Sequence, residues 1–187
     1  QGIFTLVSAL KFKIKEKPDL APIYYERLYP ISDKNKEKIE SQNYDFIIVE
    51  DIVLLTQATR LANNSKIIFD AREYYEAQNT ESFKFRFLIA PIRAAILNYC
   101  LPKCTKVFTV SQSIANAYSK KYKRKIDVLR SIPNYRDLPS KKTNKDNIRI
   151  VHHGIGYKTR GIKDMIDIGN ALDERFTLDL YLVANKK

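Results

Sequence analysis

Short runs of apolar residues alternate along the chain with longer stretches in which apolar positions recur every three or four residues. Several runs are apolar almost throughout, such as Phe46–Val49 and Ile67–Phe69. Strands that are buried on both faces, as in parallel sheets, have this composition. The runs predict strands over Phe4–Ala9, Ile23–Leu28, Phe46–Val49, Lys66–Phe69, Lys106–Val110, Ile126–Leu129, Arg149–His152 and Thr177–Val183.

The stretches between these runs have the period of an amphipathic helix. They predict helices over Lys34–Gln42, Ile52–Ala62, Ser82–Leu101, Ser113–Lys121 and Ile162–Leu172. Strands and helices that alternate in this way indicate α/β layers joined by right-handed crossovers. We therefore predict an α/β fold, with a Rossmann-like parallel sheet and flanking helices.

A polar, charged and turn-rich stretch breaks this pattern in the last third of the chain. We predict a first domain over residues 1–139, a linker over 140–147 and the first β-α-β of a second domain over 148–187. The chain begins with Gln1, its only methionine is Met165, and it ends just after a strand pattern. We therefore expect a piece of a longer protein, truncated at both ends.

The composition is that of a globular chain, with 44% apolar residues, 29% charged residues and a net charge of +12. Between Lys103 and Arg149 lie 13 basic and 3 acidic residues, with the densest run over Lys120–Lys125. Such a surface attracts phosphorylated ligands, anionic lipid headgroups or other polyanions, although a solvated helix end also accounts for the run. We do not expect a nucleic-acid partner, and a basic nucleic-acid-binding protein is the least favoured alternative, because the run lacks the aromatic and glycine pattern of common RNA-binding modules.

Cys100 and Cys104 are the only cysteines, and no histidine stands near them to complete a zinc motif. Two cysteines in a chain of this length indicate reduced thiols in a cytosolic compartment rather than a disulfide scaffold. No stretch approaches the roughly 18 consecutive apolar residues that span a bilayer, and the N-terminal run lacks the features of a signal peptide. These features predict a cytoplasmic location.

Charged side chains follow two of the predicted strands. Asp70, Arg72 and Glu73 come directly after one buried run, and Glu50 and Asp51 after another. Ligands of open α/β sheets bind at the carboxyl ends of the strands, so these residues are candidates for a site and for general acid–base chemistry. A local salt-bridge turn is an equal alternative for the first group, and Asp51 also suits the N-cap of the next helix.

Hydroxyl and imidazole side chains give weaker signals. Ser111 follows a third strand and suits the N-cap of a helix, and no Ser/His/Asp arrangement surrounds it. His152 and His153 are adjacent, with no cysteine or carboxylate at a metal-ligand spacing. A structural role at the end of a strand is therefore favoured, and no metal site is predicted.

A glycine-rich turn follows the first strand of the predicted second domain. Gly154, Gly156 and Gly161 fall within eight positions, and Arg160 stands just before a helix. Glycines let the backbone approach a phosphate, a helix N-terminus favours an anion, and arginine pairs with phosphate oxygens. The third glycine of the dinucleotide fingerprint is missing, so NAD is not predicted. A phosphate-binding loop and an ordinary turn remain equal alternatives.

Several of these segments together resemble glycosyltransferase family 4. The likeness extends over residues 44–183 and depends on the order and spacing of short pieces. The pieces that carry it are Tyr44–Asp51, Ile68–Tyr74, Val107–Ser111, Ile132–Asn134, Val151–Gly154 and Arg160–Ile162.

The resemblance implies the GT-B architecture of two facing Rossmann-like domains, and transfer of a sugar from a nucleotide-sugar donor to a glycan or lipid-linked acceptor. It implies retention at the anomeric carbon, no cofactor, no obligatory metal, and a role in the synthesis of cell-surface polysaccharide or glycolipid. It implies that Arg160 and the glycines of the segment 154–161 bind the diphosphate of the donor. It assigns the acceptor side to Asp70, Arg72 and Glu73, with Glu50, Asp51, Ser111 and Asn134 as further cleft residues.

The sequence departs from the family pattern at two of these positions. Arg72 stands where the family has the histidine of its Asp-x-His-Glu segment, so the role of an imidazole does not carry over. Ile155 follows Gly154, where such loops often have a basic residue, and this leaves Arg160 as the clear diphosphate ligand. These departures also fit an inactive homologue or a non-catalytic α/β binding module.

The segment Phe83–Ile89 mixes cations with large apolar side chains. Such a surface, together with the basic stretch that begins at Lys103, suits docking on an anionic membrane, where lipid-linked acceptors lie. We therefore expect that the protein is peripheral at the cytoplasmic face. A helix that turns its apolar side to the core is the favoured alternative for this segment.

Overall fold

The structure, a computed structural model, describes residues 20–157 and 160–183, and the predicted strand Phe4–Ala9 lies outside them. Contacts divide the chain between Pro133 and Asn134 into two units, which are described separately. No helix or strand occurs over residues 129–147, where the predicted linker lies.

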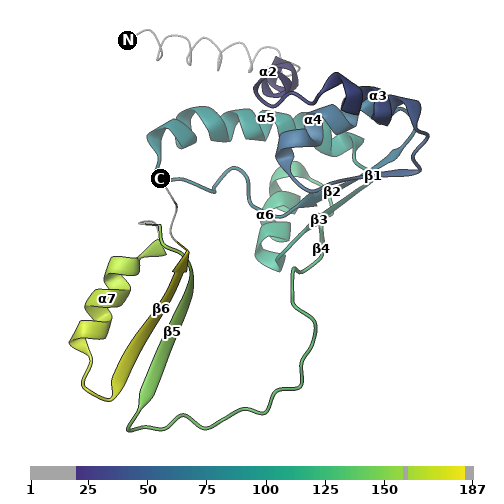
Figure 1. Cartoon of the computed structure of the whole chain (residues 1–187). Coiled ribbons are helices and arrows are strands. Elements are labelled where there is room, and N and C mark those ends of the chain that lie inside the picture. The colour runs from purple at the N-terminus through teal and green to yellow at the C-terminus, as the bar shows by residue number, and fades with distance from the viewer. Residues whose placement is uncertain (1–19, 158–159, 184–187) are drawn as a thin grey trace. The chain divides into compact units, whose positions relative to one another are not determined.

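Unit 1 is built on a four-stranded parallel sheet in the order β1-β2-β3-β4 (Figure 1). Each strand lies beside the next in the sequence, so the helices that join them are crossovers over a face of the sheet. The strands are β1 (Phe46–Val49), β2 (Lys66–Ala71), β3 (Lys106–Thr109) and β4 (Asp127–Val128). Unit 1 is thus a Rossmann-like α/β fold, as predicted.

The helices pack against one face of this sheet, which carries the buried side chains of Phe69 and Val107. No described helix or strand covers the other face, and Phe46 and Ile48 of β1 are exposed there, so the predicted burial of the strands on both faces is wrong. The core between the helices and the sheet contains side chains with no exposed surface, among them Phe69 and Ile96. The helices are α2 (Leu20–Leu28), α3 (Asp33–Ser41), α4 (Ile52–Leu61), α5 (Ala90–Cys100) and α6 (Gln112–Tyr122).

The predicted strand Ile23–Leu28 is wrong, because these residues belong to helix α2. Ala21 and Tyr25, four residues apart, are buried, whereas Ile23 is exposed. This spacing is that of a helix face and not of a strand.

The predicted helix Ser82–Leu101 contains a change of winding. A π-helical turn, η1 (Phe85–Ile89), precedes α5, and a 3₁₀ turn, η2 (Leu101–Lys103), follows it. The Ala90 N–H donates to the Phe85 carbonyl, five residues back. Pro91 has no N–H to continue the α-helical ladder behind it, which favours the wider turn at this point.

Unit 2 contains a parallel pair of strands, β5 (Ile148–Ile155) and β6 (Phe176–Val183), joined through α7 (Ile162–Ala171). None of the described residues in these three elements is buried. Val151, Ile168 and Val183 each expose more than half of their surface. Within the part of unit 2 that the structure describes, no closed hydrophobic core is therefore present.

Candidate functional site

Three of the predicted site residues form an ion-paired group at the carboxyl edge of the unit 1 sheet. Arg72 Nη2 lies 3.1 Å from Glu50 Oε2, and Arg72 Nε lies 3.3 Å from Asp70 Oδ2. One arginine after β2 thus joins carboxylates from two adjacent strands. We call Glu50, Asp70 and Arg72 the rim triad.

The strand register brings the rim triad together. Val49 of β1 pairs with Phe69 of β2, so Glu50 and Asp70 occupy the next position on neighbouring strands. The Arg72 N–H donates to the Asp70 carbonyl at 3.1 Å, which turns the chain back over the edge. Thr109, fully buried at the end of β3, donates its hydroxyl to the Ala71 carbonyl at 2.6 Å and fixes the neighbouring backbone.

The members of the triad differ in exposure. The side chains of Glu50 and Arg72 are 64% and 55% exposed, whereas that of Asp70 is 17% exposed. Asp70 Oδ1 is buried and has no hydrogen-bond partner among residues 20–157 and 160–183. A carboxylate oxygen in this position has free capacity to accept a hydrogen bond from a hydroxyl or amide group.

Asp51 and Ser111 lie at the same edge, but both cap helices. Asp51 Oδ1 accepts the Val53 N–H at 3.0 Å at the start of α4. Ser111 Oγ accepts the Ile114 N–H at 3.4 Å at the start of α6 and lies 3.1 Å from the Ser113 hydroxyl. Each side chain therefore has the capping role that the sequence offered as an alternative.

A tyrosine from α6 holds the loop that carries Arg72 and Glu73. The Tyr118 hydroxyl donates to the Glu73 carbonyl at 2.8 Å and accepts the Tyr75 N–H at 3.0 Å. Burial raises the pKa of Tyr118 above its ordinary value, so the hydroxyl stays protonated. The Glu73 side chain remains exposed. The sequence analysis did not identify Tyr118. The available signal was its spacing of three residues from Ala115, which places both side chains on the buried face of α6.

Two further contacts extend this attachment of the loop. Glu76 accepts hydrogen bonds from Tyr122 and Lys121 at the end of α6, and its side chain is 8% exposed. Arg93 of α5 donates to the Tyr75 carbonyl at 3.0 Å and also bonds Gln78. The loop after β2 is therefore tied to helices on both sides, which keeps the rim triad in one arrangement.

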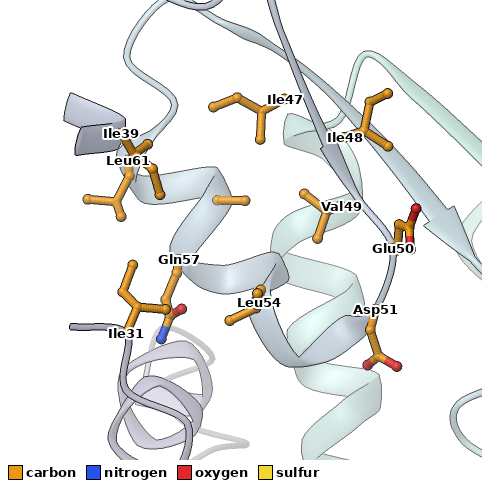
Figure 2. A pocket seen from close by; sticks show the side chains of 11 residues that line it. Ile31, Ile39, Ile47, Ile48, Val49, Glu50, Asp51, Leu54, Gln57 and Leu61 are labelled. Carbon is orange, nitrogen blue, oxygen red and sulfur yellow. The ribbon is translucent and has the colours of Figure 1, made fainter. Parts of the chain in front are cut away.

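A pocket of about 400 Å³ lies beside the rim, between β1 and the helices α3 and α4 (Figure 2). Glu50 and Asp51 lie together at one end of it (Figure 2). Gln57 in its wall donates to the Tyr29 carbonyl, and its Oε1 has no partner in the described part of the chain. The remaining lining is aliphatic: Ile31, Ile39, Ile47, Ile48, Val49, Leu54, Ala58 and Leu61.

The glycine-rich turn of unit 2 uses two of its three glycines for their conformation. Gly154 has φ of 151° and Gly161 has φ of 65°, both in the region that favours glycine. A Cβ at Gly156 would meet Leu182 at an ordinary 3.7 Å, so this position does not require glycine. Arg160 is exposed, and its side chain has no ion pair with a described residue.

Most backbone amides of this turn are already bonded. The N–H groups of Gly156, Tyr157 and Arg160 donate to carbonyl oxygens of Val183, Ile155 and Tyr157, respectively. The amides at the start of α7, where no side chain caps the helix, are left for an anion. The carboxylate of Asp164 lies in this first turn and opposes an anion there.

The dense basic run lies away from the rim triad. Lys123 and Lys125 come just before β4, at the amino edge of the sheet, whereas the triad lies at the carboxyl edge. Lys106 and Lys125 both pair with Asp127, at 2.5 and 3.6 Å. Arg124 donates to two backbone carbonyls, so part of the run serves the fold.

The other residues that the sequence singled out, Asn134 and the two histidines, lie in the linker region and in unit 2. Asn134 is exposed at the boundary of the two units. His152 lies in β5 with its Nε2 buried and without a partner in the described ranges, and His153 beside it is exposed.

Among the described residues, no group of three or more histidine, cysteine or acidic side chains is placed to hold a metal ion. In those same ranges, no helix has both the length and the hydropathy to cross a membrane.

Comparison with profiles of known protein families and with curated proteins finds no match to this chain.

Proposed function

We propose that this chain belongs to a retaining glycosyltransferase of the GT-B type, similar to glycosyltransferase family 4. The enzyme transfers a sugar from a nucleotide-sugar to a glycan or lipid-linked acceptor, in the synthesis of cell-surface polysaccharide or glycolipid. It works in the cytoplasm, as the reduced, buried cysteines favour. No cofactor takes part, and the nucleotide-sugar is a substrate.

The observation that supports this proposal is the rim triad at the carboxyl edge of a parallel sheet. Ligands of open α/β folds bind at this edge, and three of the sequence pieces that resemble the family end there: Tyr44–Asp51, Ile68–Tyr74 and Val107–Ser111. The Asp70 side chain is 17% exposed and pairs through Oδ2 with Arg72, so this carboxylate borders the surface that an acceptor hydroxyl approaches. Arg72 is held between two carboxylates and presents its remaining donors to solvent. Glu73 adds an exposed carboxylate beside it.

On the donor side, charge develops on the leaving nucleoside diphosphate and must be stabilised in the transition state. Arg160 and the uncapped start of α7 supply the positive potential. The amides of Gly156, Tyr157 and Arg160 already donate to backbone carbonyls and so do not fill this role. In the proposed donor site, the Arg160 guanidinium therefore contributes more to binding of the diphosphate than hydrogen bonds from backbone amides do.

An inactive homologue or a binding module is the second candidate. Arg72 favours it, because an arginine between two carboxylates cannot take up and release a proton as a histidine does. Such a protein would bind the nucleotide-sugar or the acceptor without turnover. A turnover assay therefore separates the two candidates.

The experiment is an assay of nucleoside diphosphate release in the full native protein, with a panel of nucleotide-sugars and of glycan or lipid-linked acceptors. The variant Asp70→Asn keeps the shape of the side chain and removes its charge. Asp45→Asn, just before β1 at the opposite edge of the same sheet, is the matched control. The proposal expects a loss of at least tenfold in acceptor-dependent release for Asp70→Asn alone. Equal rates for the two variants, or no release with any donor, would contradict it.

A further inference from the structure

The pocket beside β1 combines an aliphatic wall with polar groups at two ends. Its volume of about 400 Å³ lies within the range of small-molecule sites. Ile39 of α3, Ile47 of β1 and Leu61 of α4 converge on it from three elements. Ile48 and Leu54 in the same lining are 66% and 46% exposed, so the pocket is open to solvent on that side. An aliphatic ligand can therefore enter, and it would remove this apolar surface from water.

Gln57 supplies a buried polar group in the wall of the pocket, where it is only 3% exposed. Its Nε2 donates to the Tyr29 carbonyl at 2.5 Å, which fixes the orientation of the side-chain amide. Its Oε1 finds no donor among the residues that the structure describes. A buried amide oxygen without a donor is costly, so a ligand hydroxyl that reaches Oε1 gains a hydrogen bond without breaking one in the protein.

The other end of the pocket is acidic. Figure 2 shows Glu50 and Asp51 there, away from the Gln57 amide. The rim triad and Asp51 together contain three carboxylates and one guanidinium, which gives this end a net charge of −2. None of the described residues that line the pocket is basic. Charges more than about 8 Å away are largely screened at physiological ionic strength, so this end selects a cation although the whole chain carries +12.

The two polar ends have a defined separation along α4. Asp51 is the N-cap of this helix, and Gln57 lies six residues further on. At a rise of about 1.5 Å per residue, this spacing corresponds to about 9 Å along the helix axis. An extended chain advances about 1.2 Å per bond, so roughly seven or eight bonds join the two ends.

We propose that this pocket binds a primary aliphatic amine of about eight carbons that carries a hydroxyl group at its far end. The ammonium group lies at Glu50 and Asp51, the chain packs on the aliphatic wall, and the hydroxyl donates to Gln57 Oε1. The same carboxylates disfavour a fatty acid or a lipid phosphate, whose charge is negative. The inference goes beyond the proposed function, because it requires neither a nucleotide-sugar nor turnover.

Calorimetric titration of the 187-residue chain with a set of simple probes tests the class of ligand. The ω-amino derivative of octanol should bind saturably. Octanol, which lacks the ammonium group, should bind about fivefold more weakly, and octanoate, with the opposite charge, at least twentyfold more weakly. The ω-amino derivative of hexanol should bind at least tenfold more weakly, because each buried methylene contributes roughly a factor of four.

Substitutions at the two ends assign the polar contacts. Glu50→Gln with Asp51→Asn removes both charges, and asparagine preserves the cap of α4. This double variant should weaken binding of ω-amino-octanol at least tenfold, whereas Glu174→Gln with Asp146→Asn, at two exposed positions of unit 2, should leave it unchanged. Gln57→Leu should weaken binding of ω-amino-octanol about fivefold and should not weaken binding of octylamine, which has no hydroxyl group.

A variant that fills the pocket tests the location by a second route. Ala58→Leu adds a larger side chain to the wall, and it should weaken binding of both octyl amines at least tenfold. Urea unfolding of this variant and of Gln57→Leu verifies that each is folded. Affinity for nucleoside diphosphates should be equal in the parent chain and in these two variants, so loss of amine binding is distinguishable from failure of the proposed donor site.

Four results would overturn the inference. The parent chain could show no saturable binding of ω-amino-octanol. Equal affinities for octylamine and octanoate would exclude recognition of a cation. Equal weakening of ω-amino-octanol and octylamine by Gln57→Leu would mean that Oε1 does not accept the hydroxyl. Undiminished binding in a folded Ala58→Leu variant would place the amine outside this pocket.

Discussion

Replacement of Tyr118 by phenylalanine tests whether the rim triad depends on its attachment to α6. The change removes one oxygen atom and keeps the buried ring, which is 1% exposed. That oxygen accepts the Tyr75 N–H at 3.0 Å and donates to the Glu73 carbonyl at 2.8 Å. Both backbone groups therefore lose their partner while the packing of the ring is retained.

The expected cost follows from these two bonds. A buried amide left without an acceptor costs about 1–3 kcal/mol, and a lost bond to a carbonyl costs about 1 kcal/mol. We expect Tyr118→Phe to lower the free energy of unfolding by about 2–4 kcal/mol. For a chain of this size, that corresponds to a fall in Tm of roughly 4–16 °C.

The assay is urea unfolding followed by circular dichroism, with Tyr135→Phe as the matched control because Tyr135 is 89% exposed. Hydrogen exchange of the Tyr75 amide should accelerate in Tyr118→Phe by a factor of at least ten. A variant with the stability of the parent chain and an unchanged exchange rate would refute the claim that Tyr118 fixes the loop.

Three further predictions concern other parts of the chain. Asp51→Ala should lower the free energy of unfolding by about 1 kcal/mol through loss of the α4 cap, measured by urea unfolding against Asp45→Ala; an unchanged value would mean that Asp51 is not a structural cap. Gly161→Ala, at φ of 65°, should cost about 1–2 kcal/mol, whereas Gly156→Ala should be close to neutral; equal costs in thermal unfolding would contradict the backbone geometry. Burial raises the pKa of Cys100 to about 11 and that of Cys104 to about 12, so both thiols should resist alkylation at pH 8 until the chain unfolds. The same shift implies that folding stability falls as the pH rises from 9 towards 11, because the unfolded chain loses these protons first.

Sequence pattern predicted the parallel sheet well, because its strands are continuous apolar runs with few alternatives. The pattern failed at Ile23–Leu28, where a short apolar stretch fits a strand or a helix equally and only the burial of Tyr25 beside Ala21 decides.

The site was predictable in location and not in detail. Strand ends in a parallel sheet share one edge, so the sequence alone places Asp70 and Glu50 together. The sequence does not contain the register that lets Arg72 bridge them. It also gave no sign that Tyr118 reaches across to the loop, because that contact joins residues 43 and 45 positions apart.

The glycine-rich turn of unit 2 shows the same limit. Its three glycines indicated room for a phosphate, but the sequence does not show that the Gly156 amide bonds Val183 of β6 and that the Tyr157 and Arg160 amides bond carbonyls within the turn. These bonds leave Arg160 as the principal cation of the proposed donor site.

The most direct test of the account is calorimetric titration of the full native protein with nucleoside diphosphates and their sugar conjugates. Saturable binding of at least one nucleotide is predicted, weakened at least tenfold by Arg160→Ala and unchanged by Arg136→Ala, an exposed arginine outside any helix or strand. The absence of saturable binding, or equal weakening by the two substitutions, would contradict the assignment of this chain to nucleotide-sugar chemistry.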